Sequence, residues 1–165
     1  MALFGGQRDI SLFRNINREL INDIVQQQLG IYKLELSATT SNIYGEALEK
    51  IYKDPVLING LILRGNQNIA DDEFGSDLSR DFQFALLRDD LVDIDLVCEI
   101  GDIVLWNNLY FEVHQIVENQ LFVGKNPSYA YGDNEYLKRF GSSISIRLDA
   151  HLVRPDVVGI QQTKL

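Results

Sequence analysis

The stretch that decides the fold is GDIVLWNNLYFEVHQIVENQLFVGKNP, residues 101–127. It holds two apolar runs, Ile103–Trp106 and Leu109–Val117, which are separated by Asn107-Asn108. Both runs are rich in aromatic and β-branched residues, and two such runs around two turn-forming residues predict a β-hairpin. Asparagine tolerates positive φ angles, so the pair suits a type I′ turn. A second turn at Glu118–Gln120 would lead to a third strand, which makes a three-strand meander.

Further strands are predicted on both sides of this hairpin. In residues 81–87, Phe82, Phe84 and Leu86 recur at a period of two, which favours a strand over the alternative of a helix. Gly60 lies inside another strand, where it indicates a β-bulge. The polar stretch 65–79 is predicted to be a loop. The predicted strands outside the hairpin are residues 31–36, 56–63, 81–87, 121–123 and 144–152.

Two helices are predicted before the hairpin. Ser11 suits the N-cap of a long helix that ends near Leu29, with Gly30 as its stop. Its apolar residues recur at steps of three and four, the spacing of one buried face; they are Phe13, Ile16, Leu20, Ile21, Ile24 and Val25. Residues 89–99 begin with acids and predict a second, short helix.

These elements predict a mainly β (α+β) domain. The expected architecture is a small antiparallel β-barrel or sandwich with a long N-terminal helix and a short helix near 89–99. A parallel α/β sheet ranks lower, because the strands do not alternate with helices of suitable length. We expect a flexible N-terminal arm at residues 1–10, one β-rich domain at 11–155 and a C-terminal tail at 156–165.

Composition narrows the possible functions. The chain has 165 residues and a formal net charge of −9, which argues against a general nucleic-acid binder. The acidity is concentrated in residues 65–119, where 13 acids and 2 bases give 13 − 2 = 11 net negative charges. No stretch has the apolar length of a membrane span, and no basic-then-apolar secretory signal is present at the start. The single cysteine, Cys98, allows no internal disulfide and is predicted to lie in the core.

No catalytic or metal-binding pattern stands out. His114 and His151 lack partners at ligand spacing and are predicted to be ordinary strand residues. The acids between 89 and 102 lack the spacing and the central glycine of a calcium-binding loop. There is no phosphate-binding loop and no signature of an activated serine. We therefore predict no enzyme activity, no metal and no cofactor, although a pair of catalytic acids remains open.

Four segments of the sequence resemble one protein family, and they occur in the family's order. An amphipathic helix, predicted at residues 19–29, runs into Gly30 and a tyrosine-bearing strand at 31–36. Ile43–Ala47 is similar to a hydrophobic-aromatic-Gly-Glu element. Gly101–Val104 with Leu109–Val113 is similar to a Gly-Asp strand and its Phe-Glu-Ile hairpin partner, and Gln120–Asn126 leads into an aromatic loop. Together they resemble the smaller neck protein of T-even-type contractile-tailed bacteriophages. This chain lacks the extended C-terminal region of the larger members.

This resemblance implies a structural virion protein of a tailed phage. Such a protein forms a ring, expected to be a hexamer, in the neck that joins the DNA-filled head to the tail, and it helps to close or gate the DNA channel. Its implied partners are further copies of itself, another neck protein or the portal on the head side, and the tail terminator on the tail side. Genomic DNA would pass through without specific binding, and no membrane is involved. Assembly would take place in the bacterial cytoplasm.

Two groups of residues follow as candidates for this role. Aromatic and apolar residues in the arm, the helix and the long loop at 125–141 are candidate interface residues: Leu3, Phe4, Phe13, Tyr129, Tyr131, Tyr136 and Phe140. Acids that would form a non-adhesive channel wall are Asp71, Asp72, Glu73, Asp77, Asp89, Asp90, Asp93 and Asp95. An acidic outer surface that only aids solubility is the equal alternative. The competing functions are another tail or baseplate component and a small β-barrel binding module or enzyme.

Overall fold

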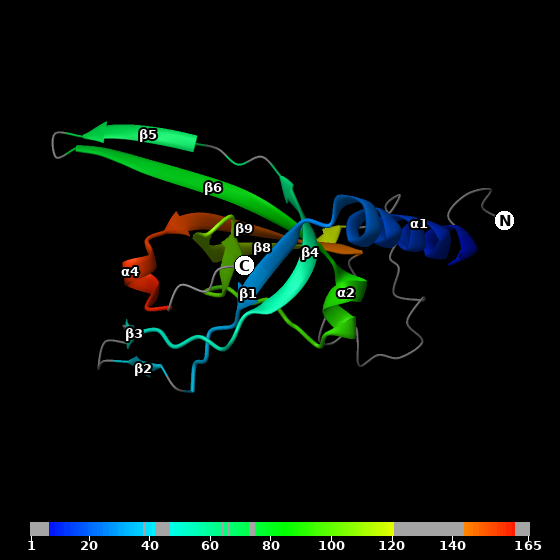
Figure 1. The fold of residues 1–165 in the computed structure, drawn as a ribbon, viewed down its shortest axis with the longest axis horizontal. Coiled ribbons are helices and arrows are strands. Elements are labelled where there is room, and N and C mark those ends of the chain that lie inside the picture. Colours follow the sequence, from blue (N-terminus) through cyan, green and yellow to red (C-terminus); the bar gives the residue numbers. More distant parts are fainter. Residues whose placement is uncertain are drawn as a thin grey trace.

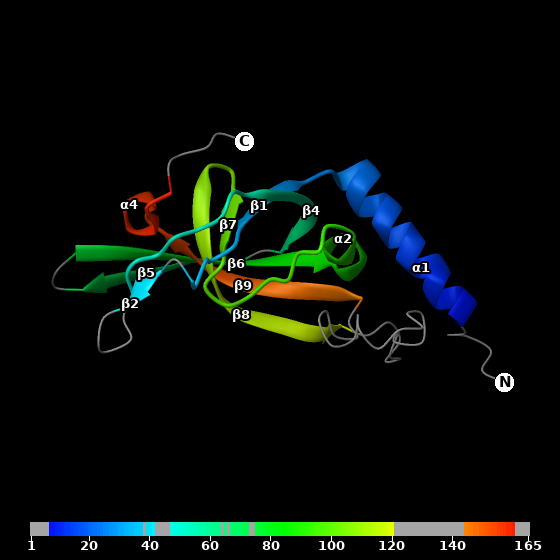
Figure 2. The same cartoon turned by 90° about the horizontal axis from the view of Figure 1, so that it is seen from below.

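The computed structural model describes residues 7–37, 39–41, 47–63, 65, 67–72, 75–120 and 144–160. Its centre is a closed, six-stranded antiparallel β-barrel, so the predicted mainly β class is confirmed (Figures 1 and 2). Neighbouring strands follow the order β4-β1-β7-β8-β9-β6, and β6 pairs back with β4 to close the ring. The barrel strands are β1 (Gln28–Tyr32), β4 (Val56–Leu63), β6 (Gly75–Leu87), β7 (Ile103–Trp106), β8 (Leu109–Gln120) and β9 (Ser145–Val153).

The remaining elements lie outside the barrel wall. A two-stranded ribbon is made by β2 (Thr40–Ser41) and β3 (Ala47–Glu49), and β5 (Gln67–Asp72) pairs only with β6. Helix α1 (Gln7–Glu19) continues into a π-helical segment, η1 (Leu20–Val25). Short helices α2 (Arg88–Asp93) and α4 (Pro155–Val158) follow β6 and β9. In both views, α1 projects from one end of the molecule, while β2 and β3 lie toward the other end (Figures 1 and 2).

The hairpin predicted from the central stretch is confirmed as β7 and β8. Asn107 and Asn108 have φ angles of 50° and 60°, the two positive values that a type I′ turn requires. Strand β8 continues past Val117 to Gln120, so the turn predicted at 118–120 is wrong. A bulge after Val113 lets this long strand stay paired with β9. The third strand of the meander is therefore β9, and residues 121–123 lie outside the described part of the chain.

The barrel closes where β4 passes from one neighbour to the other. Residues Val56–Asn59 pair with β1, and Gly60–Leu63 pair with β6. The register at Gly60 is regular, so the predicted bulge there is wrong. A Cβ at Gly60 would stand 2.7 Å from Leu86 Cδ2 and 2.8 Å from Leu29 Cδ1, so the ends of these two core side chains would have to shift to admit one. Without a Cβ at this position, Leu29 and Leu86 pack directly over the strand where the barrel closes.

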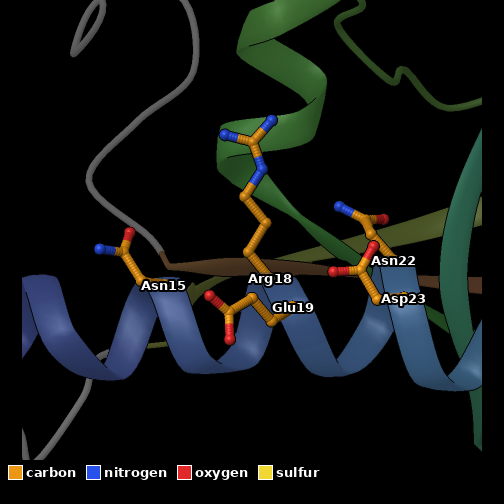
Figure 3. Close-up of a pocket in the computed structure, with 5 residues that line it drawn as sticks. All are labelled: Asn15, Arg18, Glu19, Asn22 and Asp23. Atoms are coloured by element: carbon orange, nitrogen blue, oxygen red, sulfur yellow. The ribbon is translucent and has the colours of Figure 1, made fainter.

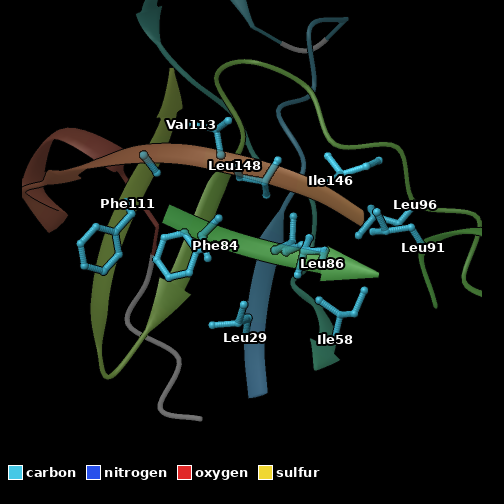
Figure 4. Packing of buried hydrophobic residues seen from close by; sticks show 13 residues of the cluster. Leu29, Ile58, Phe84, Leu86, Leu91, Leu96, Phe111, Val113, Ile146 and Leu148 are labelled. Atoms are coloured by element: carbon cyan, nitrogen blue, oxygen red, sulfur yellow. The ribbon is translucent and has the colours of Figure 1, made fainter. Parts of the chain in front are cut away.

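The core fills the barrel with aliphatic and aromatic side chains (Figure 4). Phe84 and Phe111 are fully buried, with ring centroids 5.5 Å apart in an edge-to-face arrangement. Phe82 and Trp106 extend this aromatic cluster toward the surface. Cys98 packs against the same core, as predicted. Burial raises the pKa of its thiol to about 12.

Strand β6 is longer than the sequence predicts. Its second half, from Asp81, confirms the predicted strand and pairs with β9 and β4. Its first half pairs with β5 from Gln67 to Asp72, so the loop predicted at 65–79 is wrong. Polar residues form this hairpin because backbone hydrogen bonds define a strand whatever its side chains are. The hairpin projects beyond the barrel as a two-stranded ribbon (Figure 1).

The Gly101-Asp102 pair has a structural role. Gly101 adopts a φ of +95°, which strongly favours glycine. The turn that it makes buries the Asp102 carboxylate, which is 1% exposed. Three donors converge on it: the backbone N–H of Leu34 at 3.0 Å, the backbone N–H of Glu99 at 2.7 Å and the Lys33 ammonium at 3.0 Å. This carboxylate thereby fixes the end of β1 against the segment before β7.

Several predicted boundaries need correction. The long helix from Ser11 to Leu29 is not confirmed: α1 begins at Gln7, inside the predicted arm, and helical structure ends at Val25. Gly30 lies within β1 rather than at a helix end, and the αL cap is instead Gln26, with a φ of 48°. The helix predicted at 89–99 is reduced to α2, and the strand predicted at 31–36 is β1 followed by a single bridge between Leu34 and Tyr52. The strands predicted at 56–63 and 144–152 are confirmed as β4 and β9.

Candidate interaction surface

The apolar stripe of the N-terminal helix faces outward. The sequence predicts that it packs into the core, but within it only Ile21 is buried. Five apolar side chains on α1 and η1 are between 41% and 75% exposed, and we call them the α1 outer face: Leu12, Phe13, Ile16, Leu20 and Ile24. Val25 at the end of η1 is exposed as well. The periodicity shows correctly that the helix is amphipathic, but it does not reveal what the apolar face contacts.

The opposite side of α1 is held by polar contacts. Arg14, Arg18 and Asn22 follow one another at four-residue steps and lie two residues out of phase with Leu12, Ile16, Leu20 and Ile24. Because each helical residue turns the chain by about 100°, the two rows lie on opposite sides of the helix. The polar row therefore faces the barrel side, and the apolar row faces away from it.

The polar row binds α2 and β4. The Arg14 guanidinium donates two hydrogen bonds to the Asp89 carboxylate, one from Nη2 to Oδ1 and one from Nε to Oδ2 at 2.9 Å. Arg18 lies 2.9 Å from Asp90 Oδ1 and also pairs with Asp93. Asn22 donates to Asp90 Oδ2 at 3.0 Å and accepts from Asn59 of β4 at 3.2 Å; we call these contacts the α1–α2 clamp.

Electrostatics within the clamp reflect partial burial. Desolvation raises the pKa of Asp89, and the guanidinium groups of Arg14, Arg18 and Arg88 oppose that shift. Arg88 lies fully buried at the start of α2, and its pKa is lowered by desolvation and then by the nearby charge of Arg14. Arg14 and Arg18 lie on α1 and their acidic partners lie on α2, so these ion pairs tie the two helices together.

A shallow hollow lies along the polar side of α1. It is lined by Asn15, Arg18, Glu19, Asn22 and Asp23 and has a volume of about 250 Å³ (Figure 3). All five of these described residues come from the same helical segment, and none of the five is a histidine, cysteine or serine. Its open, polar lining makes it a poor substrate pocket. The apolar face on the other side of the helix is therefore the stronger candidate for contact with another molecule.

The structure distributes the described acids over three places. Asp89, Asp90 and Asp93 lie in the clamp, with arginines as partners. Asp71, Asp72 and Asp77 belong to the β5–β6 hairpin, and Asp95 lies exposed just after α2. Glu73 lies outside the described residues. Whether any of these acids faces a DNA channel stays a prediction.

Of the predicted interface residues, Phe13 is placed on the α1 outer face. The others lie outside the described residues: Leu3, Phe4, Tyr129, Tyr131, Tyr136 and Phe140. Sequence reasoning missed Leu12, Ile16, Leu20 and Ile24 as interface candidates because a regular apolar stripe usually marks a buried face. A second, polar row at the same four-residue spacing identifies these residues. Arg14 and Arg18 of that row bind acids from α2, which leaves the apolar row on the outer side of the helix.

Two histidines distant in sequence meet on the barrel wall. His114 of β8 and His151 of β9 have ring centroids 5.6 Å apart. Among the described residues no group of three or more metal-binding side chains is present, so the pair alone does not form a metal site. No helix in the described part of the chain is long and apolar enough to cross a membrane.

Comparison with known proteins adds little. No protein-family profile and no curated protein matches the chain. Among solved structures, the phage-like element PBSX protein xkdH from Bacillus subtilis is similar over 79% of this chain and 94% of that chain, with 10% sequence identity and a TM-score of 0.34. A likeness at that score carries no argument about function.

Proposed function

We propose that this chain is a structural virion protein of a tailed phage, which forms a ring in the neck between head and tail. In this role it bridges the head-side connector and the tail, and it helps to close the channel through which DNA passes. The work is done by surfaces that bind neighbouring subunits rather than by catalysis. The sequence motifs described above suggested this family, and the α1 outer face is the observation that carries the proposal.

That face supports an assembly function for an energetic reason. Burying a Leu, Ile or Phe side chain fully contributes about 1.5–3 kcal/mol, so five side chains that are roughly half exposed offer about 5 kcal/mol. A contiguous apolar face that is bordered by polar residues is a candidate interaction site. Glu19 and Asp23 lie on the same helical segment and are exposed, which disfavours DNA and acidic membranes as its partner.

The clamp explains how the helix can present this face. A helix with its apolar side toward water would normally roll over onto the barrel. Arg14 and Arg18 prevent this rotation, because rolling would break two partly buried ion pairs, Arg14 with Asp89 and Arg18 with Asp90. The helix is thus held in the orientation that a partner subunit needs, and association requires less ordering of the chain.

The channel-wall role then falls to the projecting β5–β6 hairpin. Asp71, Asp72 and Asp77 are carried on it, whereas the negative charges of Asp89, Asp90 and Asp93 are largely neutralised by the arginines of α1. Like charges on a hairpin that lines the bore would weakly repel passing DNA within a Debye length of about 8–10 Å. Lysine at all three hairpin positions should slow DNA ejection from assembled particles.

The test uses phage particles in which the gene for this chain has been replaced by the gene for a variant. A Leu20→Asp/Ile24→Asp variant should leave DNA-filled heads without attached tails, counted by electron microscopy. The matched control is Asn15→Asp, which adds a charge to the same helix outside the apolar row. Equal numbers of joined particles with the wild-type chain, the double variant and the Asn15→Asp control would refute an assembly role for the α1 outer face. Normal yields of complete particles in the absence of the chain would refute the neck function itself.

A further inference from the structure

His114 of β8 and His151 of β9 are spaced to share one metal ion. Their ring centroids lie 5.6 Å apart. Zinc binds histidine nitrogen at about 2.0–2.1 Å in tetrahedral sites, so two imidazoles on one zinc ion have ring centres about 5 Å apart. His114 is exposed and His151 is half-buried, so an ion from solvent can reach both rings. A small rotation of the two side chains is enough for both to bind the same ion.

The bulge in β8 gives His114 its place beside His151. Val113 is buried and pairs with Ala150, and the next residue to pair with β9 is Gln115, so His114 is the extra residue of the bulge. Side chains in a regular strand alternate between its two faces. A bulge interrupts that alternation and re-aims a side chain, and such bulges are over-represented next to functional sites.

The strand register places a carboxylate next to the two rings. Glu112 is the partner of His151 in the pairing of β8 with β9, and directly paired residues project from the same face of a sheet. That face is the outer wall of the barrel, because Phe111 and Val113, the neighbours of Glu112, are buried in the core. Two histidines and one glutamate, with water in the fourth position, are a ligand set that zinc uses in proteins.

In this structure the Glu112 carboxylate is paired with Lys50. In that arrangement no group of three metal-binding side chains is found among the described residues, so an ion needs Glu112 to turn toward the histidines. The side chains of Lys50 and Glu112 are 37% and 23% exposed. An ion pair this accessible to water is weak, so Glu112 can exchange it for a metal ion at little cost.

From these placements we infer that His114, His151 and Glu112 bind one divalent transition-metal ion of the zinc class. Imidazole suits such ions, whereas Mg²⁺ and Ca²⁺ prefer oxygen ligands. Asp81 of β6 is the partner of His151 on its other side, where a carboxylate can accept the remaining ring N–H of a metal-bound histidine. The site departs from the sequence prediction of no metal, which rested on spacing along the chain. The bound ion links β8 to β9 across the barrel wall.

Titration of the purified chain with zinc chloride tests the inference. Calorimetry should show saturable binding of one ion per chain. Zinc at about 100 times its dissociation constant should raise the Tm by about 5–10 °C. His114→Ala and His151→Ala should each abolish this shift, and Glu112→Gln should weaken the affinity at least about tenfold. Gln115→Ala, at the residue that follows His114, is the matched control and should bind zinc as the unchanged chain does.

Lys50 provides a readout that a purely structural role of these residues would not change. Lys50→Met removes the competitor for Glu112 and should tighten zinc binding by up to about fivefold. The inference would be overturned by an absence of saturable zinc binding, by an equal Tm shift from magnesium chloride, or by a zinc shift that survives in the His114→Ala/His151→Ala double variant. Equal affinities in Lys50→Met and Glu112→Gln would also overturn it. The particle experiment decides the neck function separately, because these variants leave the α1 outer face unchanged.

Discussion

Replacing Arg14 with alanine is predicted to release α1 from α2 while the barrel stays folded. Arg14 is better buried than Arg18, the other arginine that pairs with α2: the Arg14 side chain is 12% exposed and that of its partner Asp89 is 23% exposed. The substitution leaves the Asp89 carboxylate partly desolvated without its fork of donors. Removing one partner of a buried ion pair costs about 3–5 kcal/mol, and an exposed pair contributes at most about 1 kcal/mol. For this partly buried pair we expect about 2 kcal/mol.

The effect should depend on pH in a defined direction. Burial raises the folded-state pKa of Asp89 above 3.8 despite Arg14, and the loss of Arg14 raises it further. The folded state then holds more protons than the unfolded state, so stability falls as the pH rises from 3.8 through the folded pKa. The penalty of Arg14→Ala should therefore be largest at neutral pH, and it should shrink as the pH falls through the raised pKa and Asp89 becomes neutral.

Hydrogen exchange of the α1 amides measures this release directly. A loss of about 2 kcal/mol corresponds to roughly 30-fold faster exchange in α1, with little change in the barrel strands, because local openings are independent of global unfolding. Asp89→Asn in the same chain should restore most of the protection, which gives a double-mutant cycle. Arg8→Ala, at an exposed arginine of the same helix, is the control. Exchange in α1 that is the same for Arg14→Ala and Arg8→Ala would refute the clamp.

Three further predictions concern the fold and its one thiol. Asp102→Ala should lower the free energy of unfolding in urea by about 3 kcal/mol or more, since three donors lose a buried carboxylate; a loss under 1 kcal/mol would contradict that role. Asn108→Gly should raise stability by about 0.5 kcal/mol, because φ at this position is 60° and glycine adopts that value without strain, whereas a decrease would mean that the Asn108 side chain is needed. Cys98 should react with a thiol reagent at least about a hundredfold more slowly in the folded chain than in urea, since burial raises its pKa to about 12; equal rates would show that the segment opens readily.

Local chemistry made the hairpin and most barrel strands predictable. Asn107-Asn108 marked its turn because few residues other than asparagine and glycine accept positive φ. The alternation around Phe84 marked one buried strand face. The β5–β6 hairpin escaped prediction because its residues are polar, and polar residues form strands only when a partner strand is available. Closure of the barrel at Gly60 depends on contacts with Leu29 and Leu86 that are distant in sequence.

The candidate surface was only partly predictable for a related reason. Periodicity reports that Leu20 and Ile24 share a helix face, and it is silent about whether that face meets the core or another molecule. The answer lies in Arg14 and Arg18, whose partners on α2 are 75 residues away in the chain. The aromatic ring of Phe13 marks it as an interface candidate, whereas the spacing of Ile16, Leu20 and Ile24 predicts a buried face.

The most direct test of the account is a cryo-electron microscopy reconstruction of the assembled particle. We predict that this chain forms a closed ring at the head–tail junction, with Leu20 and Ile24 of each copy buried against a neighbouring subunit. The account would be contradicted if the chain is found in the baseplate or as a two-fold dimer. It would also be contradicted by a ring in which the α1 outer face remains exposed to solvent.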